Sequence, residues 1–233
     1  MTAAPRIVVA TPHARYDALE AALRDVHGLD VVRIRERADL TLDHLTAVAP
    51  RFVFLPHWSW IVPVAVHQAH ACVVFHMTDL PFGRGGSPLQ NLIVRGLHET
   101  RLTALRCTDI VDAGPIYCQR PLSLAGTAEE IFERAARLME GMAVEIVRAP
   151  REPQPQVGEP TIFHRRRPAD SDIAGLDTPA RVHDHIRMLD ADGYPHAFLR
   201  AGGLHFEFTQ SHLDGDTLDA RVRIRRTHPA EPT

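Results

Sequence analysis

Short apolar runs alternate with amphipathic segments through the first 150 residues of the chain. The amphipathic segments repeat apolar residues every three or four positions, as helices do, and the short apolar runs are typical of buried strands. The expected strands are residues 6–10, 31–34, 52–55, 71–75, 102–107 and 115–121, and the expected helices are residues 16–26, 42–48, 89–96 and 127–146, with another short helix ending at residue 69. This alternation predicts an α/β fold in which a mostly parallel sheet carries helices on both faces.

The pattern changes after residue 148. Residues 149–160 contain four prolines in twelve positions, which ends the preceding helix and favours an extended linker. A helix around residues 178–190, two alternating runs joined at Gly202–Gly203 and a last strand at residues 221–224 follow. They predict a small α+β unit that contains a β-hairpin. We therefore predict two domains, residues 1–150 and residues 151–233.

The charge and composition of the chain indicate its cellular compartment and exclude some classes of partner. The formal net charge is −3 and the pI is about 6.6, which provides no basic face for the phosphates of a nucleic acid. No apolar run approaches the roughly 20 residues that a membrane-spanning helix needs, and the first residues lack the pattern of a secretory signal. The three widely spaced cysteines fit reduced thiols. We expect a cytoplasmic protein with neither a nucleic-acid nor a membrane partner.

Lysine does not occur in the sequence, so all 26 residues counted as lysine or arginine are arginine. Such a chain forms no Schiff base with a carbonyl compound or pyridoxal phosphate. It also lacks the lysine with which P-loop proteins and protein kinases hold nucleotide phosphates. The first expected strand is not followed by a G-x-G-x-x-G turn, so a dinucleotide site of that type has no support.

His76 and Asp112 are the residues best placed for chemistry. His76 ends the most apolar expected strand, where open α/β sheets bind their ligands, and Asp112 lies in a tight turn between two expected strands. On adjacent strand ends, the two side chains would share one cleft. Acyl transfer to an amine needs a group that stabilises the oxyanion and a group that removes the amine proton, and an imidazole with a carboxylate supplies both. Taken singly, such residues are more often structural, a core histidine and a turn aspartate.

Several motifs around these residues resemble the folate-dependent formyltransferases. The elements occur in the family's order: residues 76–81 (His-Met-Thr-Asp-Leu-Pro), Arg84–Gly85, Ser87–Pro88 and residues 112–116 (Asp-Ala-Gly-Pro-Ile). The resemblance covers about residues 50–150. It implies a Rossmann-like formyltransferase domain followed by a small α+β domain, with His76 and Asp112 as the catalytic residues.

The resemblance also implies 10-formyltetrahydrofolate as the donor of the one-carbon group. The residues expected to bind this folate are Leu80, Pro81, Thr108, Asp109, Ile110 and Val111. At position 74 the family has an asparagine that donates to the formyl oxygen, and this chain has Val74. His76 or a nearby donor such as Thr78 would have to replace it, or activity is lost. No metal is expected, because His67 and His70 have no further ligands nearby in the sequence.

The acceptor is expected to be an amine of an amino sugar or of its nucleotide, because residues 75–91, 163–172 and 186–195 most resemble the members of the family that act in amino-sugar and nonulosonic-acid pathways. Trp58, Trp60 and Thr78 would line its pocket, and Arg84 would hold a phosphate or carboxylate. The simpler alternative is that both indoles only pack within the protein and that the arginine only faces solvent.

Two other functions remain open. One is a non-catalytic protein that binds folate or a sugar nucleotide, and the other is a hydrolase that releases formate from formyltetrahydrofolate. The C-terminal hairpin also leaves open a homodimer, because an unpaired strand edge can add a strand from a second copy.

Overall fold

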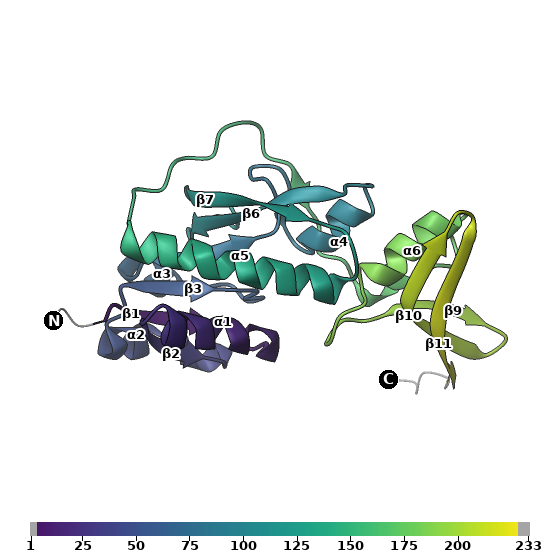
Figure 1. The fold of residues 1–233 in the computed structure, drawn as a ribbon, viewed down its shortest axis with the longest axis horizontal. Helices are drawn as coiled ribbons and strands as arrows, with labels where there is room; N and C mark the ends of the chain where they lie inside the picture. Colours follow the sequence, from purple (N-terminus) through teal and green to yellow (C-terminus); the bar gives the residue numbers. More distant parts are fainter. Residues whose placement is uncertain (1–3, 228–233) are drawn as a thin grey trace.

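A six-stranded sheet forms the centre of the larger part of the molecule (Figure 1). The structure, a computed structural model, describes residues 4–227. The strands, in spatial order, are β2 (Asp30–Ile34), β1 (Arg6–Ala10), β3 (Phe52–Leu55), β4 (Cys72–His76), β6 (Glu99–Arg106) and β7 (Ile116–Ser123). The first four are parallel to one another, and β6 and β7 are antiparallel additions. The predicted α/β fold with a mostly parallel sheet is confirmed.

Helices cover both faces of this sheet, because its central strands are apolar on both sides. In β1, Ile7 and Val9 belong to one buried cluster, whereas Val8 and Ala10 belong to another. The helices are α1 (Asp17–Ala21), α2 (Leu42–Val48), α3 (Val64–Ala69), α4 (Pro88–Ile93) and α5 (Ala128–Arg148). The first cluster includes residues of α1, α4 and α5, and the second includes Leu45 of α2 and Val66 of α3. A capping box formed by Thr127 and Glu130 starts α5.

The expected helix at residues 16–26 differs from the observed one. A 3-10 turn at Ala14–Tyr16 precedes α1, and the helix continues as a π-helical turn at Ala22–Val26. A π turn contains an extra residue, which rotates the positions that follow it. Leu19 and Leu23 are buried. Val26, at the end of the π turn, is 75% exposed instead of facing the core as its spacing predicts.

The proline-rich segment after α5 crosses over the sheet as an extended strap, which is the arching green loop in Figure 1. Gln154 exchanges backbone hydrogen bonds with Ile116 at the start of β7. Further along, β8 (Ile162–Phe163) pairs in parallel with β5 (Arg84–Gly85). We call residues 149–163 the strap. It stays bonded to the first part of the chain, and the domain boundary at residue 150 remains a prediction.

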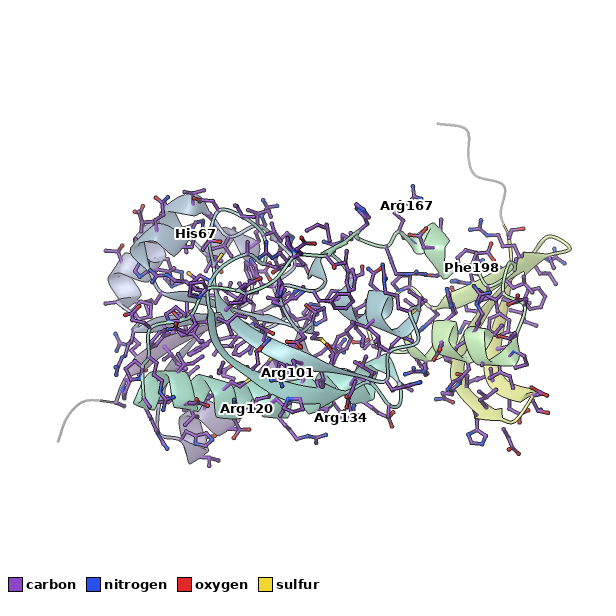
Figure 2. All side chains as sticks on the ribbon, turned by 90° about the horizontal axis from the view of Figure 1, so that it is seen from above. His67, Arg101, Arg120, Arg134, Arg167 and Phe198 are labelled. Atoms are coloured by element: carbon purple, nitrogen blue, oxygen red, sulfur yellow. The ribbon has the colours of Figure 1, made fainter. Side chains whose placement is uncertain are left out.

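The C-terminal part is a separate small sheet with one helix. A 3-10 turn (Pro168–Ser171) and α6 (Pro179–Arg187) precede β9 (Ala197–Ala201), β10 (Leu204–Asp214) and β11 (Thr217–Arg226), which pair in the order β11-β10-β9. Gly202 and Gly203 both have positive φ angles, 55° and 74°, and close the predicted hairpin between β9 and β10. Figure 2 shows His67 in the first part and Phe198 in this sheet, at the two ends of the molecule. Residues 1–3 and 228–233 of the predicted domains lie outside the described residues.

Candidate functional site

His76 and Asp112 meet in the structure. His76 is the last residue of β4 and is 6% exposed, and its Nδ1 lies 3.5 Å from Oδ2 of Asp112. The other ring nitrogen, Nε2, lies 2.7 Å from the carbonyl oxygen of Gly83. A carbonyl oxygen only accepts, so Nε2 carries a hydrogen in this arrangement. The imidazole is therefore held at both of its nitrogens.

Asp112 does not reach His76 from an adjacent strand end, so that expectation was wrong. The pairing of β4 with β6 is antiparallel, which places the end of β6 beside the start of β4. The N–H of Cys107 accordingly donates to the carbonyl oxygen of Cys72, at a distance of 2.8 Å. Residues 107–112 then return along β4 toward His76. The site is therefore built on a face of the sheet as well as at its edge.

The turn that holds Asp112 is closely constrained. Asp112 has a φ of 52°, in the left-handed region, and its Oδ2 accepts a hydrogen bond of 2.9 Å from the N–H of Gly85. A Cβ at Gly114 would lie 1.8 Å from the carbonyl oxygen of Arg106, so this position needs glycine. The Asp-Ala-Gly sequence thus produces a tight turn that aims the carboxylate at His76.

Gln156, in the strap, joins two parts of the site. Its Nε2 donates to the carbonyl oxygens of Asp112 and Gly114, both at 2.8 Å. Its Oε1 accepts from Nε and Nη2 of Arg84, at 3.1 and 2.8 Å. The sequence contains no sign of this role, because a glutamine among prolines has no periodic pattern. Arg84 directs two of its nitrogens at the strap, and its contact with an acceptor remains a prediction.

The residues expected to bind folate fall into two segments beside His76. Leu80 is 5% exposed and joins Pro81 through a cis peptide bond. The other segment, Thr108 to Val111, is exposed, with Ile110 at 68% and Val111 at 53%. Oδ1 of Asp109 lies 3.5 Å from Nε2 of the buried His67 on α3. The apolar side chains of Ile110 and Val111 are therefore open to a ligand, whereas Leu80 is buried. Folate binding by these residues remains a prediction.

The expected acceptor residues are placed differently from one another. Thr78 is fully buried, and its hydroxyl donates to the carbonyl oxygen of Gly83 at 3.4 Å. Trp58 and Trp60 contact each other edge to face, with ring centroids 4.9 Å apart. Trp58 also packs against the second apolar cluster, as Val74 and Cys107 do. The structure thus brings Trp58 to the face of the sheet that bears Val74 and turns Thr78 into the protein.

Cys107 is not a candidate nucleophile. Burial, together with the carboxylates of Asp112 and Asp109, raises the pKa of its thiol to about 11. The thiolate, which is the reactive form, is therefore scarce at neutral pH. Among residues 4–227, no group of three or more histidine, cysteine, aspartate or glutamate side chains is arranged to hold a metal ion. Over the same residues, no helix is long and apolar enough to span a bilayer.

His57 connects the first part of the chain to the C-terminal part. Its Nε2 lies 2.9 Å from the hydroxyl of Tyr194, and its Nδ1 lies 3.4 Å from the hydroxyl of Tyr16. The ring also contacts His13 and Phe132, with centroids 4.6 and 4.8 Å apart. Burial, followed by the positive charges of His13 and Arg15, lowers the pKa of His57 to about 3. His57 is therefore neutral when the protein is folded at neutral pH.

This shifted pKa predicts a loss of stability in acid. The unfolded chain protonates His57 below its ordinary pKa of 6.5, whereas the folded protein excludes that proton down to a pH of about 3. Between these values the free energy of unfolding falls as the pH falls, by at most about 1.4 kcal/mol per pH unit for this residue. Urea unfolding at pH 7 and pH 5 measures the slope. The slope should be shallower in His57→Asn, because the asparagine side chain does not bind a proton. Asparagine is chosen because it tolerates the φ of 54° at this position.

The control for this prediction is His98→Asn, which replaces an exposed histidine. It should keep the wild-type dependence on pH. Equal slopes for all three proteins would show that His57 is not the group responsible.

Comparisons with known proteins show which family the chain resembles. A profile of the methionyl-tRNA formyltransferase C-terminal domain matches residues 168–225. The methionyl-tRNA formyltransferase of Bacillus thuringiensis subsp. konkukian (strain 97-27) is 25% identical over 194 residues, which are 79% of this chain. The chain spans 60% of the length of that curated relative.

Two solved structures extend the comparison over nearly the whole chain. A sugar N-formyltransferase from Shewanella sp. FDAARGOS_354 shares the fold, with a TM-score of 0.64 at 14% identity over 85% of this chain and 93% of that one. The methionyl-tRNA formyltransferase from Clostridium thermocellum has a TM-score of 0.92 and is 38% identical, covering 96% of this chain and 100% of that one. With that identity along both chains, the protein belongs to the folate-dependent formyltransferase family.

Proposed function

We propose that the protein transfers the formyl group of 10-formyltetrahydrofolate to an amine, with His76 and Asp112 at the reaction centre. The observation that supports this most is the His76–Asp112 pair, whose side chains lie 3.5 Å apart, with Asp112 on a turn that Gly85, Gly114 and Gln156 hold in place. Membership of the family gives the donor its chemical class, a formylated reduced folate.

The reaction needs no covalent intermediate with the protein. The lone pair of the amine nitrogen forms a bond to the formyl carbon, and the carbonyl π electrons move to the oxygen. The carbonyl then re-forms, the bond to N10 of the folate breaks, and its electron pair stays on N10. One proton passes from the amine to N10, which leaves a formamide and tetrahydrofolate. Asp112 is placed to relay this proton, and His76 to stabilise the oxyanion.

The folate is proposed to lie against two segments that flank this pair. Leu80 and Pro81 would contact one side of the pterin, and the backbone of Thr108, Asp109, Ile110 and Val111 would bind its polar edge. Backbone groups of an exposed loop are free to hydrogen-bond a planar heterocycle, and apolar side chains such as Ile110 can cover it.

The acceptor is proposed to be a small molecule, such as an amino sugar or its nucleotide, rather than a tRNA. Residues 151–233 contain 11 arginines and 13 acidic residues, so this part of the chain has no excess of positive charge for a nucleic acid. Trp58, Trp60, Thr78 and Arg84 would form the acceptor side. We place the protein in the cytoplasm, where reduced folates are available, and propose that two copies associate through the C-terminal hairpin.

One observation favours a second candidate, a protein that binds folate or a sugar nucleotide without transfer. Val74 offers no hydrogen bond, and the Nε2 hydrogen of His76 is donated to Gly83. A protein whose donors are all engaged would bind ligands and leave the formyl group intact. A hydrolase, in which water replaces the amine, would use the same His76 and Asp112.

A ligand titration tests the proposal. 10-Formyl-5,8-dideazafolate, which keeps the formyl group and is chemically stable, should raise the unfolding midpoint. A ligand at about 100 times its Kd adds about 2.7 kcal/mol to the stability of the folded state. A panel of amino sugars and their nucleotides should add a further shift for one member, and that compound is then assayed for formylation.

The outcomes separate the candidates. A rise in the unfolding midpoint with folate, together with formylation of one amine, supports transfer. A rise in the midpoint without formylation supports the binding protein. Release of formate without any amine supports the hydrolase. The absence of a shift with any folate would contradict transfer, hydrolysis and folate binding, and a shift with a sugar nucleotide alone would then support the sugar-nucleotide-binding protein.

A further inference from the structure

The face of β4 next to His76 offers no hydrogen bond to a formyl oxygen. Side chains alternate along a strand, so Val74 lies on the same face as His76 and takes the position nearest to it. An oxyanion that forms there needs a donor already in place. His76 donates through Nε2 to Gly83, and the hydroxyl of Thr78 is directed at the same carbonyl oxygen. The donor therefore has to come from elsewhere.

Trp58 carries a donor that no protein atom uses. Its Nε1 is buried and has no hydrogen-bond partner among the described residues. Buried N–H groups without a partner are rare in folded proteins, and each one calls for an explanation. The rest of the indole packs against the second apolar cluster and is partly exposed. The unpaired N–H is thus on the buried edge of an indole whose other atoms are partly exposed.

Trp58 follows the strand next to the one that carries Val74 and His76. Strands β3 and β4 are parallel neighbours, with Leu55 opposite Val74. β3 ends at Leu55, and Trp58 comes three residues later, after a turn at Pro56 and His57. Leu55, Trp58 and Val74 all pack in the second cluster, on the face of the sheet that Val74 shares with His76.

The other buried nitrogens without partners lie elsewhere. They are His13 Nε2, His70 Nε2, Arg166 Nε and His196 Nδ1. His13 contacts His57 next to Phe132, which belongs to the first cluster, and His70 precedes the amino end of β4. Arg166 and His196 follow the strap. In this set, Trp58 alone packs against the second cluster, as Val74 does.

We propose that the indole N–H of Trp58 donates a hydrogen bond to the formyl oxygen of the bound folate, the bond that valine at position 74 cannot make. This inference rests on the proposed function. Trp58 would then act as a donor to the reacting carbonyl, a more specific role than stacking on the acceptor. The same bond would become stronger as negative charge develops on the oxygen during attack by the amine.

The indole hydrogen provides a test that needs no turnover. The chain contains two tryptophans, so a ¹H–¹⁵N spectrum has two indole signals, and Trp60→Phe assigns them. 10-Formyl-5,8-dideazafolate should move the Trp58 signal downfield, and 5,8-dideazafolate, which lacks the formyl group, should not. Binding of the formyl compound without this shift overturns the inference and leaves the proposed function standing. No binding at all overturns both.

Kinetics give a second test. Trp58→Phe removes the N–H but keeps an aromatic ring, and it should lower kcat by about 100-fold with a small change in KM for the folate. Tyr117→Phe is the control, because it also removes a polar hydrogen from an aromatic side chain, one that packs against the first cluster, and it should keep kcat within about threefold. Adding Val74→Asn should raise kcat at least tenfold above that of Trp58→Phe, because the asparagine amide then supplies the donor. Equal kcat for Trp58→Phe and Tyr117→Phe would overturn the inference.

Discussion

His76→Ala should lower kcat for formyl transfer by about 10²–10⁴-fold while the protein still folds. The size of the loss is that of a general acid–base group or an oxyanion donor. Removal of the imidazole leaves Asp112 without its partner and leaves the Gly83 carbonyl without the N–H it now accepts. Single-turnover kinetics with saturating folate would measure the chemical step directly, and circular dichroism would confirm the fold.

Asp112→Asn should give a loss of the same order, because the amide keeps the shape of the side chain but not its charge. The negative charge is what lets Asp112 accept the proton of the amine. Asparagine also tolerates the left-handed backbone at this position, where φ is 52°. The loss of activity would then reflect chemistry rather than a rebuilt turn.

The chain contains a matched control for the pair. His67 lies 3.5 Å from Asp109, the same separation as in the pair of His76 with Asp112, and the two histidine side chains are 5% and 7% exposed. His67→Ala therefore removes a similarly buried histidine from a similar carboxylate, close to the same loop. It should leave kcat within a fewfold of wild type. A value for His76→Ala equal to that of His67→Ala would contradict the assignment.

Local patterns were sufficient for most of the fold. Strands β1, β3 and β4 are short, strongly apolar runs between segments of helical period, and the Thr127–Glu130 capping box marks the start of α5 in the sequence itself. The Gly202–Gly203 turn is equally local. His76 was identified in the same way, as a polar residue at the end of a buried strand.

The rest of the site depends on contacts between distant residues. Gly85 and Asp112 are 27 residues apart in sequence, and Gln156 and Asp112 are 44 apart. The direction of β6 relative to β4 decides where residues 107–112 lie, and nothing in the β6 sequence specifies that direction. Gln156 can bond to the turn of Asp112 and Gly114 only because the strap passes over that turn. Hydrophobic periodicity contains no information about such pairings.

The strap itself yields the largest expected effect on stability. Phe163→Ala should lower the free energy of unfolding by about 3–5 kcal/mol, as the removal of a buried phenylalanine commonly does. Phe163 is 2% exposed, its ring packs edge to face on Phe82, and the guanidinium of Arg95 lies 4.4 Å from the ring centroid. Urea unfolding of the wild type and the variant would measure the difference.

The same substitution should also weaken catalysis, because Phe163 supports the loop that holds His76. A Cβ at Gly83 would lie 2.7 Å from Cε2 of Phe163, so the ring packs directly on the residue whose carbonyl oxygen contacts His76. A cavity at this point frees the loop, and kcat should fall even at a temperature where the variant remains folded. Ile162→Ala is the control, since the neighbouring side chain is 57% exposed and its loss should change stability by no more than about 0.5 kcal/mol. If the two variants unfolded at the same urea concentration, the strap would not be the anchor of the site, and the link from Phe163 through Gly83 to His76 would fail with it.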